Sequence, residues 1–163
     1  MPRRIFYSFH YKPDSWRVSK IRNIGAIEGN KPATDNDWET VTGRGDAAIE
    51  KWIKDQMFGR SCAVVLIGQN TAGRKWINHE IIESWKKGMG LFGIHIHNIT
   101  NSAGEQSSKG SSPFFGFNIG DKSLSSIVKV YDPPFSTSSN VYNHIAENMA
   151  SWIDEAISIR NKY

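Results

Sequence analysis

One apolar run followed by one amphipathic run constrains this chain more than any other feature. Every residue from Cys62 to Ile67 is apolar, which is typical of a strand that is buried on both faces of a sheet. A short polar loop follows, and apolar residues then recur at helical spacing from Gly73 to Trp85, with Ile77 and Ile81 on one face. Together the two runs predict a strand followed by a helix that packs on it, the building unit of a parallel α/β sheet.

Glu80 stands out within this predicted helix. Trp76, Glu80 and Ser84 form a second stripe, turned slightly from the apolar one. A carboxylate one turn from a Trp and beside an apolar stripe can be partly desolvated, and perturbed carboxyl groups cluster at functional sites. Spacing alone leaves a second interpretation equally open, in which Glu80 is an ordinary solvated glutamate on an exposed helix face.

The rest of the chain continues the alternation of strands and helices. We expect strands at residues 4–9, 61–67, 91–97 and 126–131 with a brief edge strand at 26–27, and helices from Asp14 or Ser15 to Ile24, from 46 to 57 and from 139 to 160. Two polar loops, 28–45 around Trp38 and 98–116, separate some of these elements. The order predicts a single α/β domain over residues 1–163: a flavodoxin-like doubly wound sheet of about five mainly parallel strands, with helices on both faces.

Such a sheet predicts where a ligand binds. Ligands of doubly wound sheets lie beyond the carboxyl ends of the strands, near the point where the strand order reverses. That rule selects residues 8–10, residues 68–70 and the first turns of the helices that follow them.

Composition excludes several classes of function. A formal charge of +4 is mildly basic, well short of a nucleic-acid-binding footprint. No Gly-rich phosphate-binding pattern is present, and no stretch approaches the roughly 18 apolar residues that span a bilayer. His95 and His97 alternate on a predicted strand without further ligands, so we expect no metal site. The lone Cys62 and the absence of an amino-terminal leader pattern favour a cytoplasmic protein with no membrane or nucleic-acid partner.

Four segments carry a resemblance to a known family: Phe6-Tyr7-Ser8-Phe9-His10-Tyr11, Val64-Val65-Leu66-Ile67-Gly68, Thr71-Ala72-Gly73-Arg74-Lys75-Trp76 and Gly93-Ile94-His95-Ile96-His97-Asn98. They resemble the TIR-like family of bacterial proteins, and within it the ThsB component of the Thoeris anti-phage defence system. The spacing from Trp76 to Glu80 is similar to that in TIR domains that cleave NAD, where a glutamate at this place is catalytic.

The resemblance implies an NAD-processing signalling enzyme, a NAD glycohydrolase or ADP-ribosyl cyclase. It would cleave the nicotinamide–ribose bond and make a cyclic ADP-ribose-type messenger in anti-phage defence. NAD would be the substrate, and no separate cofactor is expected. The implied partners are an effector activated through the nucleotide product, a phage-derived trigger and further copies of the chain. The alternative is a non-catalytic TIR-like module for protein interaction or nucleotide sensing.

The resemblance also implies a set of site residues. Glu80 would be catalytic, because a carboxylate stabilises the oxocarbenium ion that develops on the ribose. The expected substrate-binding residues supply aromatic faces, a hydroxyl donor and a carboxylate near a helix start: Phe6, Tyr7, Ser8, Phe9, Asp46 and Trp76. Strand alternation sends Tyr7 and Phe9 to one face and Phe6 and Ser8 to the other, so not all of them can serve. Asn78 and His79 replace the small residue usual in this helix, which leaves the detail of the pocket open.

Overall fold

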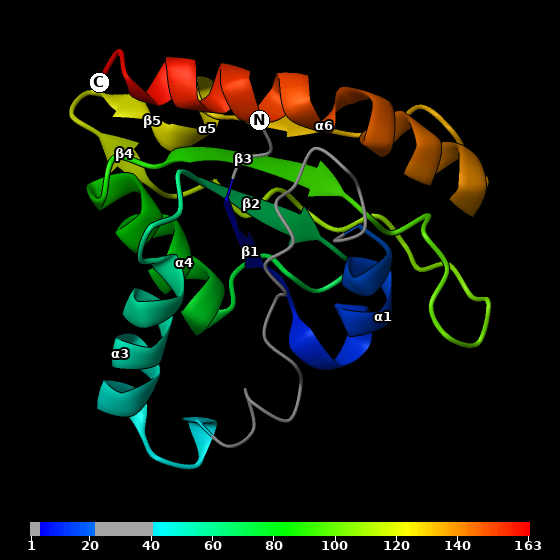
Figure 1. Cartoon of the computed structure of the whole chain (residues 1–163), viewed down its shortest axis with the longest axis horizontal. Helices are drawn as coiled ribbons and strands as arrows, with labels where there is room; N and C mark the ends of the chain where they lie inside the picture. The colour runs from blue at the N-terminus through cyan, green and yellow to red at the C-terminus, as the bar shows by residue number, and fades with distance from the viewer. Residues whose placement is uncertain (1–3, 22–40) are drawn as a thin grey trace.

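A computed structural model describes residues 4–21 and 41–163 (Figure 1). Its central sheet, within these residues, has four parallel strands in the order β1-β2-β3-β6. They are β1 (Ile5–Ser8), β2 (Cys62–Ile67), β3 (Gly90–His95) and β6 (Lys129–Tyr131). The strand order and the helices between the strands are those of a flavodoxin-like, doubly wound α/β fold, so the predicted fold class is confirmed.

Helices cover both faces of this sheet. They are α1 (Tyr11–Ile21), α3 (Asp46–Met57), α4 (Lys75–Lys86), the short α5 (Leu124–Ile127) and the long α6 (Ser138–Arg160). Figure 1 shows α6 running along one side of the sheet, while α3 and α4 lie on the other. Side chains of α1 and α6 share one buried cluster, and those of α3 and α4 share another.

The two clusters follow directly from strand alternation. Along β1, Ile5 and Tyr7 face α1 and α6, whereas Phe6 faces α3 and α4. β2 alternates in the same way, and all six of its residues are buried because both of its faces are covered. Ser8 is the next residue after Tyr7, so it lies on the same face as Phe6, under α4. The Ser8 side chain can therefore contact residues of α4.

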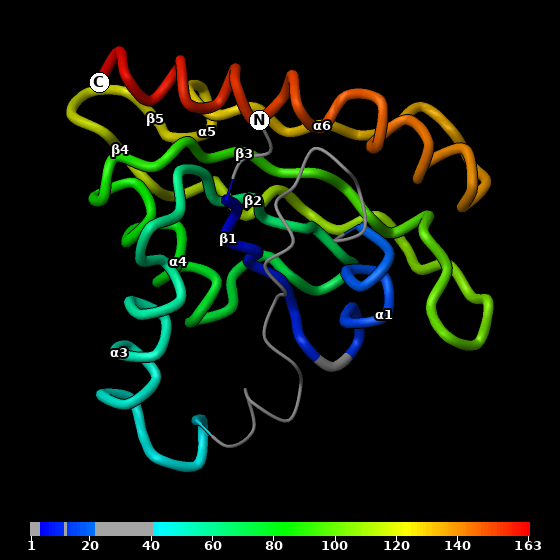
Figure 2. The backbone as a smooth tube through the Cα atoms, viewed as in Figure 1, coloured from blue at the N-terminus to red at the C-terminus, as the bar shows by residue number. Residues whose placement is uncertain are grey.

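The segment 98–116 follows β3 and contains no helix or strand (Figure 2). Arg17 of α1 anchors its first part: Nε donates to the Ile99 carbonyl (2.6 Å) and Nη2 donates to the Glu105 carbonyl (3.0 Å). Its second part crosses the end of β2, where a Cβ atom on Gly110 would lie 2.1 Å from the Gly68 carbonyl oxygen. Only glycine permits this approach of one backbone to the other, and it fixes the returning chain beside the loop after β2.

Several predicted elements differ from those observed. α1 begins at Tyr11 rather than after Asp14 or Ser15, because Pro13 is tolerated in a first turn and the Asp14 amide bonds the His10 carbonyl (3.1 Å). The strand expected at 126–131 is divided: Leu124–Ile127 forms α5, and only Lys129–Tyr131 pairs with β3. Short apolar runs of this kind do not distinguish strand from helix.

A small hairpin within the described residues had not been predicted. β4 (Asn118–Ile119) pairs antiparallel with β5 (Lys122–Ser123) around a two-residue turn whose Gly120 has a φ of 63°. The expected edge strand at 26–27, the end of the first helix at Ile24 and Trp38 all lie outside the described residues.

Candidate functional site

A cleft of about 950 Å³ opens at the carboxyl ends of β1 and β2. It is lined by residues 9–11, which follow β1, by residues 69–70, which follow β2, and by residues 72–77 at the start of α4, together with Thr42, Glu80 and Ser111. The cleft thus lies at the edge of the sheet that the doubly wound order predicts for a ligand. Its volume is at the upper end of the range for small-molecule sites, large enough for a dinucleotide.

Glu80 is the only acidic residue among those that line the described cleft, and it is buried, with 3% of its surface exposed. α4 begins at Lys75, so Glu80 lies in its second turn, on the face that packs toward the sheet. The Ser8 hydroxyl donates a hydrogen bond to Glu80 Oε1 over 2.9 Å. Ser8 is itself 2% exposed, and 72 residues separate it from Glu80 in sequence. The exposed-helix interpretation of Glu80 is therefore wrong.

Burial perturbs the Glu80 carboxyl strongly. Loss of solvation raises its pKa from 4.5 to about 8, and the hydrogen bond from Ser8 offsets part of this rise. A carboxyl group in this condition is largely protonated at neutral pH. It ionises when a positive charge comes close, because an opposite charge favours the ionised form. The site thus holds an acid whose charge state a ligand can change.

Aromatic rings flank the carboxyl group. Trp76, one turn before Glu80 on α4, is half-buried and lines the cleft. Its ring meets His79 edge-on with centroids 5.4 Å apart, and the Lys75 ammonium lies 4.9 Å from its centroid. Phe9, just after β1, stacks on Tyr11 with centroids 4.3 Å apart, and both line the cleft. Phe9 and Tyr11 are only 3% and 7% exposed, so Trp76 is the ring among these three on which a flat ligand can stack.

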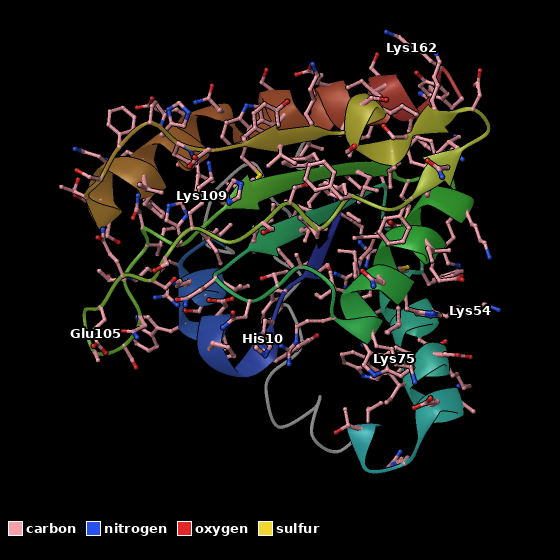
Figure 3. All side chains as sticks on the ribbon, turned by 180° about the vertical axis from the view of Figure 1, so that it is seen from behind. His10, Lys54, Lys75, Glu105, Lys109 and Lys162 are labelled. Atoms are coloured by element: carbon pink, nitrogen blue, oxygen red, sulfur yellow. The ribbon has the colours of Figure 1, made fainter. Side chains whose placement is uncertain are left out.

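The cleft also carries positive charge at its rim. Arg74 and Lys75 line it at the start of α4 and are exposed. Lys75 forms an ion pair with Asp46 of α3, and both side chains are about two-thirds exposed. His10 lines the cleft after β1; burial, and then the nearby Arg74, lower its pKa, so its imidazole is neutral at neutral pH. Figure 3 shows His10 and Lys75 on the side of the molecule away from α6.

The structure separates the predicted substrate-binding residues into three groups. Phe9 and Trp76 line the cleft together with Glu80. Ser8 contacts Glu80 from behind and does not line the cleft. Phe6 and Tyr7, which are 4% and 3% exposed, belong to the two core clusters, and Asp46 reaches the rim only through its ion pair with Lys75. Phe6 and Tyr7 pack in the core and, unlike Phe9, do not line the cleft.

Other cleft residues had not been predicted as site residues. His10, Gln69 and Asn70 fall within the strand-end segments that the fold rule selects, so that rule carried the signal for them. Thr42 and Ser111 come from the two segments predicted as long polar loops, where sequence offers no periodic signal; in the structure Thr42 is helical. Ser111 is brought there by the close contact of the neighbouring Gly110 with Gly68.

Two further properties concern the described part of the chain as a whole. Among residues 4–21 and 41–163, no group of three or more His, Cys, Asp or Glu side chains could hold a metal ion. In the same residues, every helix is too short or too polar to cross a bilayer.

Fold and cleft together define a class: a doubly wound α/β domain with a ligand cleft at the strand ends and a buried carboxyl group in its wall. Comparison with known proteins identifies the family. The family model for the TIR-like domain of the Thoeris protein ThsB matches residues 6–101. This chain belongs to that family of TIR-like domains.

A relative from Bacillus cereus (strain MSX-D12) is named "putative cyclic ADP-D-ribose synthase ThsB1". The two sequences are 34% identical over 119 residues, which is 70% of this chain. The matched region is 62% of the relative's length, so the chain spans less than two thirds of that protein.

Proposed function

We propose that this protein is an NAD-processing enzyme that cleaves the nicotinamide–ribose bond and makes a cyclic ADP-ribose-type messenger in anti-phage defence. The observation that carries the proposal is the buried carboxyl of Glu80, which lines a cleft of dinucleotide size and is held by Ser8 at 2.9 Å. Membership of the ThsB family and the name of the Bacillus cereus relative support the same activity.

The chemistry needs one carboxylate beside the ribose. When the bond between the ribose and the nicotinamide ring nitrogen breaks, both bonding electrons leave with the nitrogen, and nicotinamide departs as a neutral molecule. Positive charge then develops on the ribose as an oxocarbenium ion. The Glu80 carboxylate stabilises that charge from its buried position in the cleft wall, where electrostatic interactions are strong. Capture by a nucleophilic atom from the adenosine end of the same molecule closes the ring, and capture by water gives free ADP-ribose.

The raised pKa of Glu80 fits a positively charged substrate. The nicotinamide ring of NAD carries a fixed positive charge, and its arrival beside Glu80 favours loss of the carboxyl proton to solvent. The acid limb of kcat/KM, which reports the free enzyme, is therefore expected at about pH 8. The acid limb of kcat, which reports the bound complex, is expected at lower pH.

The cleft offers contacts for both ends of the dinucleotide. Trp76, which is half-buried, offers an aromatic face for nicotinamide or adenine, and the buried ring of Phe9 forms part of the cleft wall. Arg74 and Lys75 lie at the rim, where the diphosphate would carry its negative charge.

The test is nicotinamide release from NAD, with products separated by chromatography and identified by mass. Wild type is compared with Glu80→Gln and with Glu83→Gln, a matched control on the same helix whose carboxylate is paired with Lys86 (4.0 Å). We expect Glu80→Gln to lose about a hundredfold or more in kcat, the usual cost of removing one charge-stabilising group, and Glu83→Gln to match wild type.

Each protein is assayed alone and with extract from phage-infected cells, because we propose that a phage-derived trigger and self-association activate it. We also propose that the product acts on a separate effector. Equal activity of Glu80→Gln and wild type would contradict the catalytic role of Glu80. Absence of turnover in both conditions, with NAD binding retained, would instead favour the interaction or sensing module.

A further inference from the structure

Ser8 and Glu80 form a buried polar pair at the meeting point of β1 and α4. Ser8 is the last residue of β1 and pairs in register with Val65 of β2, so its position is fixed by the sheet. Its side chain is 2% exposed, and that of Glu80 is 3% exposed. The hydroxyl donates to Oε1 across 2.9 Å.

Only Glu80 of this pair lines the cleft. Ser8 lies behind it, on the α4 face of the sheet, so a ligand in the cleft meets the carboxyl first. We propose that Ser8 is a positioning residue for Glu80: its hydroxyl holds the carboxyl group in the cleft wall and does not itself contact the ligand. This inference rests on the proposed function, and it replaces the expectation that Ser8 binds substrate directly.

A purely structural role does not explain this pair. Two polar groups buried against each other add little net stability, and replacing both by apolar groups of similar shape is often neutral or stabilising. The surroundings are apolar: Ile77 and Ile81 of α4 and Val65 of β2 are all buried in the cluster on this face. A carboxyl group placed here needs a donor to fix its orientation, and Ser8 supplies it from the rigid strand below.

The hydrogen bond also affects which form of the carboxyl is stable. A donor favours the ionised form, so removing the Ser8 hydroxyl raises the pKa of Glu80 further. Each unit of increase lowers the ionised fraction at neutral pH about tenfold. Loss of orientation adds a second effect, a lower kcat that persists at high pH, where the carboxyl is ionised in every variant.

The experiment compares Ser8→Ala, Ser8→Thr and Ser84→Ala with wild type. Ser8→Ala removes the donor, and Ser8→Thr keeps a hydroxyl in the same place. Ser84→Ala is the matched control, because Ser84 is a fully buried serine on α4 whose hydroxyl donates to the Ile81 carbonyl (3.0 Å) rather than to Glu80. We measure kcat and KM for NAD across pH, and the titration of the Glu80 carboxyl by carbon-13 NMR, with its signal assigned from Glu80→Gln.

We expect Ser8→Ala to reduce kcat at least tenfold at neutral pH with KM little changed, and to move both the acid limb and the NMR titration to higher pH. Ser8→Thr should recover most of the loss, and Ser84→Ala should match wild type. The proposal is overturned if Ser8→Ala acts on KM alone, if the Glu80 titration does not move, or if Ser84→Ala causes the same loss. The titration requires no NAD, so it tests the link between Ser8 and Glu80 even if wild type proves unable to cleave NAD.

Discussion

Glu80→Gln should make the protein more stable, and the gain should grow with pH. Glu80 has its ordinary pKa near 4.5 in the unfolded chain, whereas burial raises its pKa to about 8 in the folded protein. Between these values the unfolded chain releases the proton and the folded protein retains it. The free energy of unfolding of wild type therefore falls as pH rises through this window and levels off above about pH 8. Glutamine has no proton to lose, so the variant lacks this decline.

The magnitude follows from the width of the window. Each pKa unit corresponds to about 1.4 kcal/mol, so the full decline is about 5 kcal/mol, of which about 3 kcal/mol is already present at pH 7. The carboxyl is almost fully buried, so solvent screening does not reduce this contribution much. A difference of this size is a large part of the total stability of an ordinary domain.

Urea unfolding at several pH values between about 5 and 9 measures the effect. Other groups titrate in this range, so the informative quantity is the difference between Glu80→Gln and wild type at each pH. Glu83→Gln is the control, because Glu83 is more exposed on the same helix and its substitution removes no buried carboxyl. A flat difference for Glu80→Gln would refute the claim that Glu80 is buried in a state that resists ionisation.

Two further predictions concern Trp76 in the cleft wall and the contact between Gly110 and Gly68. Trp76→Ala should raise KM for NAD by about tenfold with a smaller effect on kcat, because stacking of a base on an aromatic ring contributes about 1–3 kcal/mol. Trp76→Phe should keep most of the affinity. Isothermal titration with ADP-ribose gives the same comparison without turnover, and equal affinities of wild type and Trp76→Ala would contradict the role of the ring. Gly110→Ala should destabilise the protein by about 1–3 kcal/mol in urea unfolding, because the new Cβ would meet the Gly68 carbonyl oxygen. Ser102→Ala, at an exposed position in the same segment, should change the stability little. Equal stabilities of Gly110→Ala and wild type would contradict the close contact.

The elements with strong periodicity were predictable from sequence. β2 and α4 were expected at 61–67 and 73–85 and occur at Cys62–Ile67 and Lys75–Lys86. α6 likewise spans Ser138–Arg160, close to the expected 139–160. α4 and α6 have helical apolar spacing over more than ten residues, and the short apolar run of β2 is rich in β-branched residues and ends at Gly68, which favours a strand. Because these elements alternate along the chain, the parallel sheet and its ligand-binding edge followed from them.

The elements that were predicted wrongly or missed are those whose secondary structure depends on residues distant in sequence. Leu124 and Ile127 of this helical turn are both buried, and Leu124 packs in the cluster beneath α3 and α4, a contact that local sequence does not reveal. The β4–β5 hairpin did carry a local signal, the Gly120-Asp121 pair at its turn, but each strand has only two residues. Ser111 reaches the cleft from a long loop whose path is set by contacts such as that of Gly110 with Gly68.

Glu80 and Glu83 show why helical spacing alone, without the family resemblance, could not identify which carboxyl is buried beside the cleft. Both are glutamates on one helix, three residues apart, and spacing gave Glu80 no better than even odds of being special. The difference comes from Ser8, 72 residues away in sequence, which β1 carries beneath α4 and which bonds Glu80 but not Glu83. A buried carboxyl that costs the folded protein about 3 kcal/mol at neutral pH has no structural benefit to match that cost, and sites of this kind are where function is expected to oppose stability. If Glu80→Gln is both more stable and inactive while Glu83→Gln is neither, then the same carboxyl group, that of Glu80, lowers the stability of the fold and provides the activity.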